Sequence, residues 1–171
     1  MNIVLVGMPG SGKTAIGKLI AAELQREFLD VDEWIAATTG RDTSDHLAEL
    51  GDNGFLDFEC EISKQIQLAN GVIATTGSNP LRADGINHLR KDSITIWMDV
   101  PLEIIEARVG KRKDGDTRIV GAQTMTFPEI LAWRIKEYEK NHDLRFVVDR
   151  EKPKAENAAL LLQLLKNKNV C

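Results

Sequence analysis

Gly7-Met8-Pro9-Gly10-Ser11-Gly12-Lys13-Thr14 is the stretch that decides the fold. It follows the apolar run 3–6 and precedes a segment whose apolar residues recur at helical spacing, so we predict a strand, a glycine loop and a helix. The stretch matches the phosphate-binding pattern G-x-x-x-x-G-K-S/T, whose glycines let backbone N–H groups surround an anion at a helix N-terminus. A glycine-rich turn without a ligand is the alternative, but the complete pattern in this setting favours phosphate binding.

The residues predicted to contact a nucleotide through this loop are consecutive: Gly10, Ser11, Gly12, Lys13, Thr14 and Ala15. Lys13 is expected to reach the β- and γ-phosphates, and the Thr14 hydroxyl is expected to bind Mg²⁺. ATP and Mg²⁺ are therefore the predicted cofactors. The loop predicts a phosphoryl donor and leaves the acceptor open.

The whole chain has the size and composition of one compact α/β domain over residues 1–171. It has 171 residues, of which 43% are hydrophobic and 28% charged, and a net charge of −4. This charge gives no reason to expect nucleic acid or an anionic membrane as partner. The chain enters its first strand directly and has no apolar run near the roughly 20 residues of a membrane span. We expect no signal peptide, a cytoplasmic protein, and a monomer or weak homodimer.

Cysteines and histidines predict no disulfide framework or metal site. Cys60 and Cys171 lie far apart in the sequence. His46, His88 and His142 are scattered and lack metal-ligand spacing, so we expect ordinary surface or helix-end residues.

Strands and helices alternate along the chain, which predicts a five-stranded parallel sheet with helices on both faces. The predicted strands are 3–6, 28–32, 72–75, 93–98 and 145–148. The predicted helices run from the glycine loop to about 26, then over about 33–38, 43–50, 55–69, 81–90, 101–109, 127–142 and 153–166, with breaks at Gly51 and Gly54.

Residues from about 110 to 126 interrupt this alternation with a crowded run of charges and glycines and no periodic apolar face. A solvated loop is one interpretation. We favour a mobile lid, because a kinase must exclude water from the transferring phosphoryl group.

Asp30 and Asp32 alternate at the end of the second predicted strand, where ligands bind in open α/β sheets. Helix capping is the alternative role for this pair. No Asn-Lys-x-Asp sequence of the guanine-binding type is present, and no long second domain is available to convert hydrolysis into motion. The pattern therefore favours a small kinase.

These ordered features resemble the shikimate kinase family over nearly the whole chain. The features are the glycine loop, the acid pair with Thr39-Gly40 after it, the start of the helix at 55–59, the loop at Gly77, a lid containing Arg118, and Arg134 followed by Tyr138. The resemblance implies the P-loop NTP hydrolase fold of the nucleoside/shikimate kinase type, with transfer of the γ-phosphoryl group of ATP to a hydroxyl of a small metabolite.

The resemblance also implies roles for the two acids. Asp32 corresponds to the acid that orients the acceptor hydroxyl and accepts its proton. Asp30 corresponds to the acid nearer the metal, which holds Mg²⁺ through its water shell.

Further roles follow for three arginines and one loop. Arg118 corresponds to the catalytic lid arginine, Arg108 to an arginine against the adenine, and Arg134 to an arginine that binds the substrate carboxylate. Pro153 ends a loop, 149–153, that resembles the one closing over the base. Solvated or salt-bridged surface positions are the alternative for the arginines, and we expect Tyr138 to be core packing.

The predicted substrate-binding residues, Asp32, Leu56, Gly77 and Arg134, include two departures from the family. The family has Phe-Arg where this chain reads Phe55-Leu56, and three glycines where it reads Thr76-Gly77-Ser78. We therefore expect an acceptor other than shikimate. Two hypotheses address the lost cation: Arg82 replaces it, or Asp57 selects an acceptor with an amine. A genuine shikimate kinase with a rearranged pocket, and a degenerate nucleotide-binding regulatory protein, are the alternatives.

Overall fold

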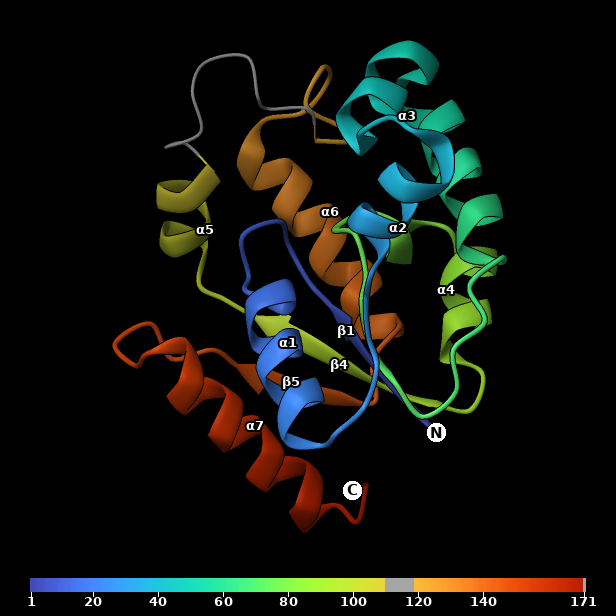
Figure 1. Cartoon of the computed structure of the whole chain (residues 1–171). Helices are drawn as coiled ribbons and strands as arrows, with labels where there is room; N and C mark the ends of the chain where they lie inside the picture. Colours follow the sequence, from blue (N-terminus) through green and yellow to red (C-terminus); the bar gives the residue numbers. More distant parts are fainter. Residues whose placement is uncertain (110–118, 171) are drawn as a thin grey trace.

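The computed structural model describes residues 1–109 and 119–170, and it contains one five-stranded sheet (Figure 1). The strands are β1 (Asn2–Val6), β2 (Phe28–Asp30), β3 (Val72–Ala74), β4 (Ser93–Asp99) and β5 (Leu144–Val147). All four neighbouring pairs are parallel, in the order β2-β3-β1-β4-β5. The predicted five-stranded parallel sheet is confirmed.

β1 is the central strand and carries the glycine loop at its carboxyl end. Ile3 pairs with Val72 of β3 on one side and with Ile94 of β4 on the other. All five residues of β1 are buried, as expected for a strand covered on both faces. The loop therefore starts from the most enclosed part of the molecule.

Helices cover both faces of the sheet. They are α1 (Lys13–Glu23), α2 (Val31–Thr39), α3 (Thr43–Ser63), α4 (Ala83–Arg90), α5 (Leu102–Val109), α6 (Phe127–Lys140) and α7 (Lys154–Asn167), with a short 3₁₀ turn, η1 (Asn79–Leu81). α1 packs against α7, and α3 packs against α4 on the other side of the molecule (Figure 1). Right-handed crossovers between parallel strands produce this division.

The second strand is shorter than predicted, because Asp30 ends it. Asp30 is the N-cap of α2, and its Oδ1 accepts hydrogen bonds from the backbone N–H groups of Asp32 at 2.9 Å and Glu33 at 3.4 Å. Capping satisfies donors that the first turn leaves without partners. Asp32 therefore lies in the first turn of a helix, and the predicted strand 28–32 was too long by two residues.

α3 contains the two predicted helices, which meet at the predicted break, Gly51, whereas Gly54 is helical and does not interrupt the second one. Gly51 has φ 66 and ψ 177, a conformation essentially restricted to glycine, and it separates two helical halves. The second half ends at Ser63, six residues before the predicted end. Backbone bonds from Gln65 to Ile62 and from Ile66 to Ser63 tighten the chain there, so Ile66 is buried from a turn.

Other boundaries moved by one to three residues. The helix predicted from 81 is preceded by η1, which contains Pro80, and starts at Ala83. α6 ends at Lys140, two residues early, and the imidazole Nδ1 of His142 lies 2.8 Å from the carbonyl oxygen of Tyr138.

A second, smaller hydrophobic cluster lies away from the sheet. We call it the outer cluster, and it consists of Leu47, Phe55, Leu56 and Val120. Asp52 adds a polar contact, because its Oδ2 accepts a 3.0 Å hydrogen bond from the Gly121 N–H. The chain after the undescribed segment is thereby attached to α3.

Within residues 1–109 and 119–170, the helices are all too short or too polar to cross a lipid bilayer.

Candidate active site

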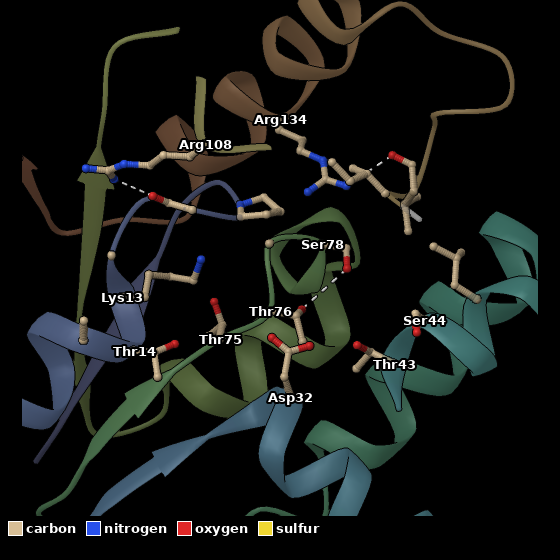
Figure 2. Close-up of a pocket in the computed structure, with 18 of the residues that line it drawn as sticks. Lys13, Thr14, Asp32, Thr43, Ser44, Thr75, Thr76, Ser78, Arg108 and Arg134 are labelled. Carbon is tan, nitrogen blue, oxygen red and sulfur yellow. Dashed lines mark hydrogen bonds between the residues drawn. The ribbon is translucent and has the colours of Figure 1, made fainter. Parts of the chain in front are cut away.

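A cavity of about 550 Å³ lies at the carboxyl ends of the central strands (Figure 2). Its lining comes from the glycine loop, the start of α2, both halves of α3, the loop after β3, and α6. The lining residues are Pro9, Gly10, Gly12, Lys13, Thr14, Ala15, Asp32, Thr43, Ser44, Leu47, Phe55, Thr75, Thr76, Gly77, Ser78, Arg108, Ile119, Val120, Arg134 and Lys154. Most of the predicted site residues are therefore brought together around one space.

Lys13 is held inside the glycine loop. Its Nζ donates hydrogen bonds to the carbonyl oxygens of Gly7 at 2.8 Å and Met8 at 3.0 Å, and the residue is 7% exposed. Burial lowers the pKa of Lys13 to about 8, although the nearby carboxylates of Asp32 and Asp30 act in the opposite sense. A bound phosphate would stabilise the protonated, positively charged form of Lys13, which burial disfavours.

Thr14 and Asp30 form the second polar pair of the loop. The Thr14 hydroxyl donates a 2.7 Å hydrogen bond to Asp30 Oδ2, while Oδ1 caps α2. Both carboxylate oxygens of this buried side chain are thus already engaged. The donors are hydroxyl and carboxylate oxygens, which are the ligands that Mg²⁺ prefers, so the residues fit this ion.

Asp32 lines the cavity, whereas Asp30 is not among the lining residues. Figure 2 shows the Asp32 carboxylate facing the cavity below Thr76. Its negative charge raises the pKa of Lys13 in the glycine loop and the pKa of Glu59 on α3, so it acts electrostatically on both residues. The helix-capping alternative therefore applies to Asp30.

Arg134 reaches the cavity from α6 although it is almost fully buried. It is 1% exposed, and its Nη2 donates to the carbonyl oxygen of Val120 at 3.2 Å. Its Nε has no hydrogen-bond partner among the residues that the structure describes. A buried cation that lines a cavity is suited to bind an anionic group.

Gly77 is required by its neighbours. A Cβ at this position would lie 2.5 Å from Pro9 Cδ and 2.9 Å from Arg134 Nη1. Its carbonyl oxygen accepts a 2.7 Å hydrogen bond from the Tyr138 hydroxyl. Tyr138 is fully buried, as expected of core packing, and it also holds this loop in place.

Glu59 was missed by the sequence analysis. It is 1% exposed, and its Oε1 accepts hydrogen bonds from the Thr76 hydroxyl and, at 2.8 Å, from the Ser78 hydroxyl. Burial raises the pKa of Glu59 to about 7 despite these two donors. A signal was available: Glu59 shares a helical face with Phe55 and Ile62, where an acid is unusual.

The departures from the family pattern on α3 lie outside the cavity lining. Leu56 is 3% exposed and packs in the outer cluster. Asp57 and Arg82 pair with each other on the surface at 3.1 Å, with side chains 71% and 39% exposed. The structure therefore contradicts both hypotheses, since Arg82 does not supply a cation to the cavity and Asp57 does not face an acceptor.

The remaining predicted nucleotide-binding residues differ in position. Arg108 lines the cavity and donates from Nη1 to the Gly10 carbonyl oxygen at 2.6 Å. The Ser11 side chain points inward and is fully buried, and its Oγ has no partner in the described part of the chain. Pro153 precedes α7, and the next residue, Lys154, lines the cavity. Arg118 and the first half of the predicted lid, 110–118, lie outside the described residues.

His46 departs from the expectation for the three histidines. It is 9% exposed, stacks on Phe58 with ring centroids 4.3 Å apart, and lies 2.9 Å from the Thr39 hydroxyl. It therefore packs between α2 and α3. Within the described ranges, no group of three potential metal ligands from His, Cys, Asp and Glu side chains is assembled.

A parallel sheet in this order, a glycine loop after its central strand, and a polar cavity beside that loop define a P-loop kinase. Comparison with known families makes this specific, because the shikimate kinase model matches residues 9–166. The chain belongs to the shikimate kinase family, whose members are phosphotransferases that use ATP and act on a hydroxyl group.

Individual relatives agree with this assignment. Over 167 residues the chain is 33% identical to human threonine synthase-like 1, covering 96% of this chain and 22% of that protein, so it spans about a fifth of the relative's length. It is 34% identical to shikimate kinase from Thermodesulfovibrio yellowstonii over 151 residues, or 88% and 86% of the two chains. The structure of Acinetobacter baumannii shikimate kinase in complex with shikimate superposes with a TM-score of 0.85 at 25% identity, covering 99% and 95%.

Proposed function

We propose that this kinase transfers the γ-phosphoryl group of ATP to a hydroxyl of a small metabolite other than shikimate. The observation that carries the proposal is the wall of the cavity after β3, where Thr76 and Ser78 place side chains on either side of Gly77. Both hydroxyls are tied to Glu59, so the two side chains have fixed positions. They occupy space that a glycine backbone would leave to a ring.

Asp32 is the residue proposed to act on the acceptor hydroxyl. Its carboxylate orients the acceptor hydroxyl and accepts the proton as the oxygen attacks the γ-phosphorus. A new P–O bond forms, the bond between the γ-phosphorus and the bridging oxygen breaks, and ADP leaves with that electron pair. Lys13 supplies positive charge to the phosphates during this exchange.

Thr14 and Asp30 are the residues proposed to hold Mg²⁺. Their 2.7 Å hydrogen bond supports this role, because it holds a hydroxyl oxygen and a carboxylate, both ligand types that Mg²⁺ prefers, next to each other beside the glycine loop. When bound, Mg²⁺ neutralises charge on the phosphates.

Different residues are proposed to bind ATP and the phosphoryl acceptor. Gly10, Ser11, Gly12 and Ala15 are proposed to line the phosphate site, while Arg108 and Pro153 are proposed for the base. Arg118 is proposed as the arginine that closes on the phosphates. Arg134 is proposed to bind an acceptor carboxylate, which is supported by its burial and its place in the cavity lining.

The loss of an arginine at the position of Leu56 supports an altered acceptor. Removing one buried arginine contact to a carboxylate weakens binding by about 2 to 5 kcal/mol. Leu56 makes no compensating polar contact, because it belongs to the outer cluster. Among the described residues proposed to contact the acceptor, Arg134 of α6 is then the one cation available to the shikimate carboxylate.

A genuine shikimate kinase with a rearranged pocket is the second candidate. Two observations favour it: relatives carrying that name cover most of the chain, and Arg134 faces the cavity. The two candidates differ in one measurable quantity, the turnover of shikimate.

The test is a coupled ADP-release assay with purified protein, ATP and Mg²⁺ over hydroxylated acids, sugars and amino alcohols, with shikimate included. We expect at least one non-shikimate acceptor to raise ADP release well above the hydrolysis background, and shikimate to remain near it. Efficient phosphorylation of shikimate, identified by mass spectrometry, would establish the second candidate instead.

A further inference from the structure

We infer that the acceptor of this kinase is a hydroxylated amino acid, whose ammonium group is bound by the hydroxyl oxygens of Thr76 and Ser78 and whose carboxylate is bound by Arg134. This inference rests on the proposed function and specifies its substrate class. Glu59 is assigned as the positioning residue that fixes the two hydroxyls.

The direction of the hydrogen bonds decides what the wall offers. Thr76 and Ser78 each have one hydroxyl hydrogen, and both hydroxyls donate to the same oxygen, Oε1 of Glu59. The Asn79 N–H donates to the Thr76 hydroxyl oxygen at 3.1 Å. With both hydrogens donated to Glu59, the hydroxyl oxygens of Thr76 and Ser78, which lie 3.5 Å apart and line the cavity, keep lone pairs that can accept a hydrogen bond.

The acidic side chains near Thr76 and Ser78 also favour a hydrogen-bond donor. Glu59 is almost fully buried, and in the described part of the chain no basic side chain forms an ion pair with it. Asp32 adds a second carboxylate on the cavity side. A wall of acceptor oxygens near the Asp32 carboxylate favours a donor with positive charge, and an ammonium group has three N–H donors and no acceptor.

The adjoining cation supplies the complementary site. Arg134 Nη1 lies close enough to Gly77 that a Cβ there would be 2.9 Å away, so the guanidinium stands beside the residue between the two hydroxyls. Figure 2 shows Ser78 and Thr76 between Arg134 and Asp32. A carboxylate at Arg134, an ammonium at the hydroxyls and a hydroxyl at Asp32 are the three groups of a hydroxy amino acid.

The test uses two matched sets of probes that differ by single groups. Homoserine is compared with γ-hydroxybutyrate, which lacks the amine, and with propanolamine, which lacks the carboxylate; serine is compared with hydracrylate and ethanolamine in the same way. In the ADP-release assay we expect kcat/KM for one amino acid to exceed each of its two partners by about 10- to 100-fold, the size expected for a charge-assisted hydrogen bond.

Two variants and a control examine the wall itself. Ser78→Ala and Glu59→Gln are expected to raise KM for the amino acid about 10-fold, with a smaller effect on kcat, and to reduce the preference over the amine-free partner. Ser63→Ala is the matched control, since Ser63 is fully buried and accepts a 2.7 Å bond from Asn79 in the same polar network but does not line the cavity. It is expected to leave that preference unchanged.

The outcomes separate the two proposals. If an amine-free acceptor from the wider panel is phosphorylated better than both amino acids, the inference is overturned and the proposed kinase function stands. If shikimate is the best acceptor, or if no compound stimulates ADP release, both are overturned. If Ser63→Ala changes the preference as much as Ser78→Ala does, the wall is a packing feature and the assignment of Glu59 is wrong.

Discussion

The Tyr138 hydroxyl donates a 2.7 Å hydrogen bond to the carbonyl oxygen of Gly77, and this bond ties α6 to the loop after β3. Burial raises the pKa of Tyr138 to about 12, so the phenol remains a donor across the physiological range. Arg134 of α6 and the hydroxyls of Thr76 and Ser78 in the loop after β3 are thus held in place relative to each other by this bond.

Tyr138→Phe removes this bond and leaves the Gly77 carbonyl without its partner. We expect the free energy of unfolding to fall by about 1 to 3 kcal/mol, the cost of a buried unsatisfied polar group. Urea denaturation followed by tryptophan fluorescence measures it, since the three tryptophans are retained. An unchanged midpoint would show that the bond does not contribute to stability.

Asp30 has two separable tasks, capping α2 and supporting Thr14. Asp30→Ala loses both, and we expect a loss of about 0.5 to 2 kcal/mol in unfolding free energy. Asp30→Asn retains a capping oxygen, so it should keep most of the stability while requiring more Mg²⁺ for half-maximal ADP release. Equal stability of the two variants in urea would contradict the capping role.

Asp32→Asn tests the proposed proton acceptor. An amide cannot take the proton from the acceptor hydroxyl, so we expect kcat to fall by about 10² to 10⁴. Binding of a non-hydrolysable ATP analogue, measured by calorimetry, should change little because the glycine loop is intact. Turnover equal to that of the unmodified protein would remove Asp32 from the mechanism.

Glu59 predicts a pH dependence of stability. Its pKa of about 7 in the folded protein lies above the ordinary glutamate value of 4.5, so its contribution to stability is fully present below about pH 4.5 and is lost as pH rises through about 7. Relative to Glu59→Gln, the unmodified protein should lose up to about 3 kcal/mol between these limits. Urea denaturation of both proteins across this range measures the difference. A constant difference would mean that Glu59 titrates normally.

The burial of Leu56 in the outer cluster predicts that this cluster contributes to the free energy of unfolding. Leu56→Ala should cost about 2 to 5 kcal/mol, because a 3% exposed side chain leaves a cavity beside Val120. Leu50→Ala is the matched control on the same helix, since Leu50 is 43% exposed, and it should cost less than about 0.5 kcal/mol. Similar losses for both variants would show that the cluster is not tightly packed.

The sheet and the donor side of the cavity could be predicted from the sequence, because both rest on local signals. The glycine loop carries its own geometry in Gly10 and Gly12, which have φ of 80 and 96. The run 3–6 is apolar throughout, as a central strand requires. Such features need no knowledge of distant residues.

The acceptor side could not be predicted in the same way, because it depends on contacts between residues far apart in the chain. Leu56 and Asp57 are adjacent in sequence, but one enters the outer cluster and the other pairs with Arg82 on the surface. The importance of Glu59 arises from Thr76 and Ser78, which lie 17 and 19 residues away. Spacing alone did not indicate that pairing.

The kink at Gly51 lets the second half of α3 take its own orientation, and that half is bonded to the chain at Gly121. The residue after Gly51, Asp52, holds the Gly121 N–H, while the helical half that follows carries Phe55 and Glu59. Any rotation of that half when an acceptor enters must either carry Gly121 along or break the 3.0 Å bond. The orientation of that half and the position of the chain that follows residue 118 are therefore linked by the bond between Asp52 and Gly121.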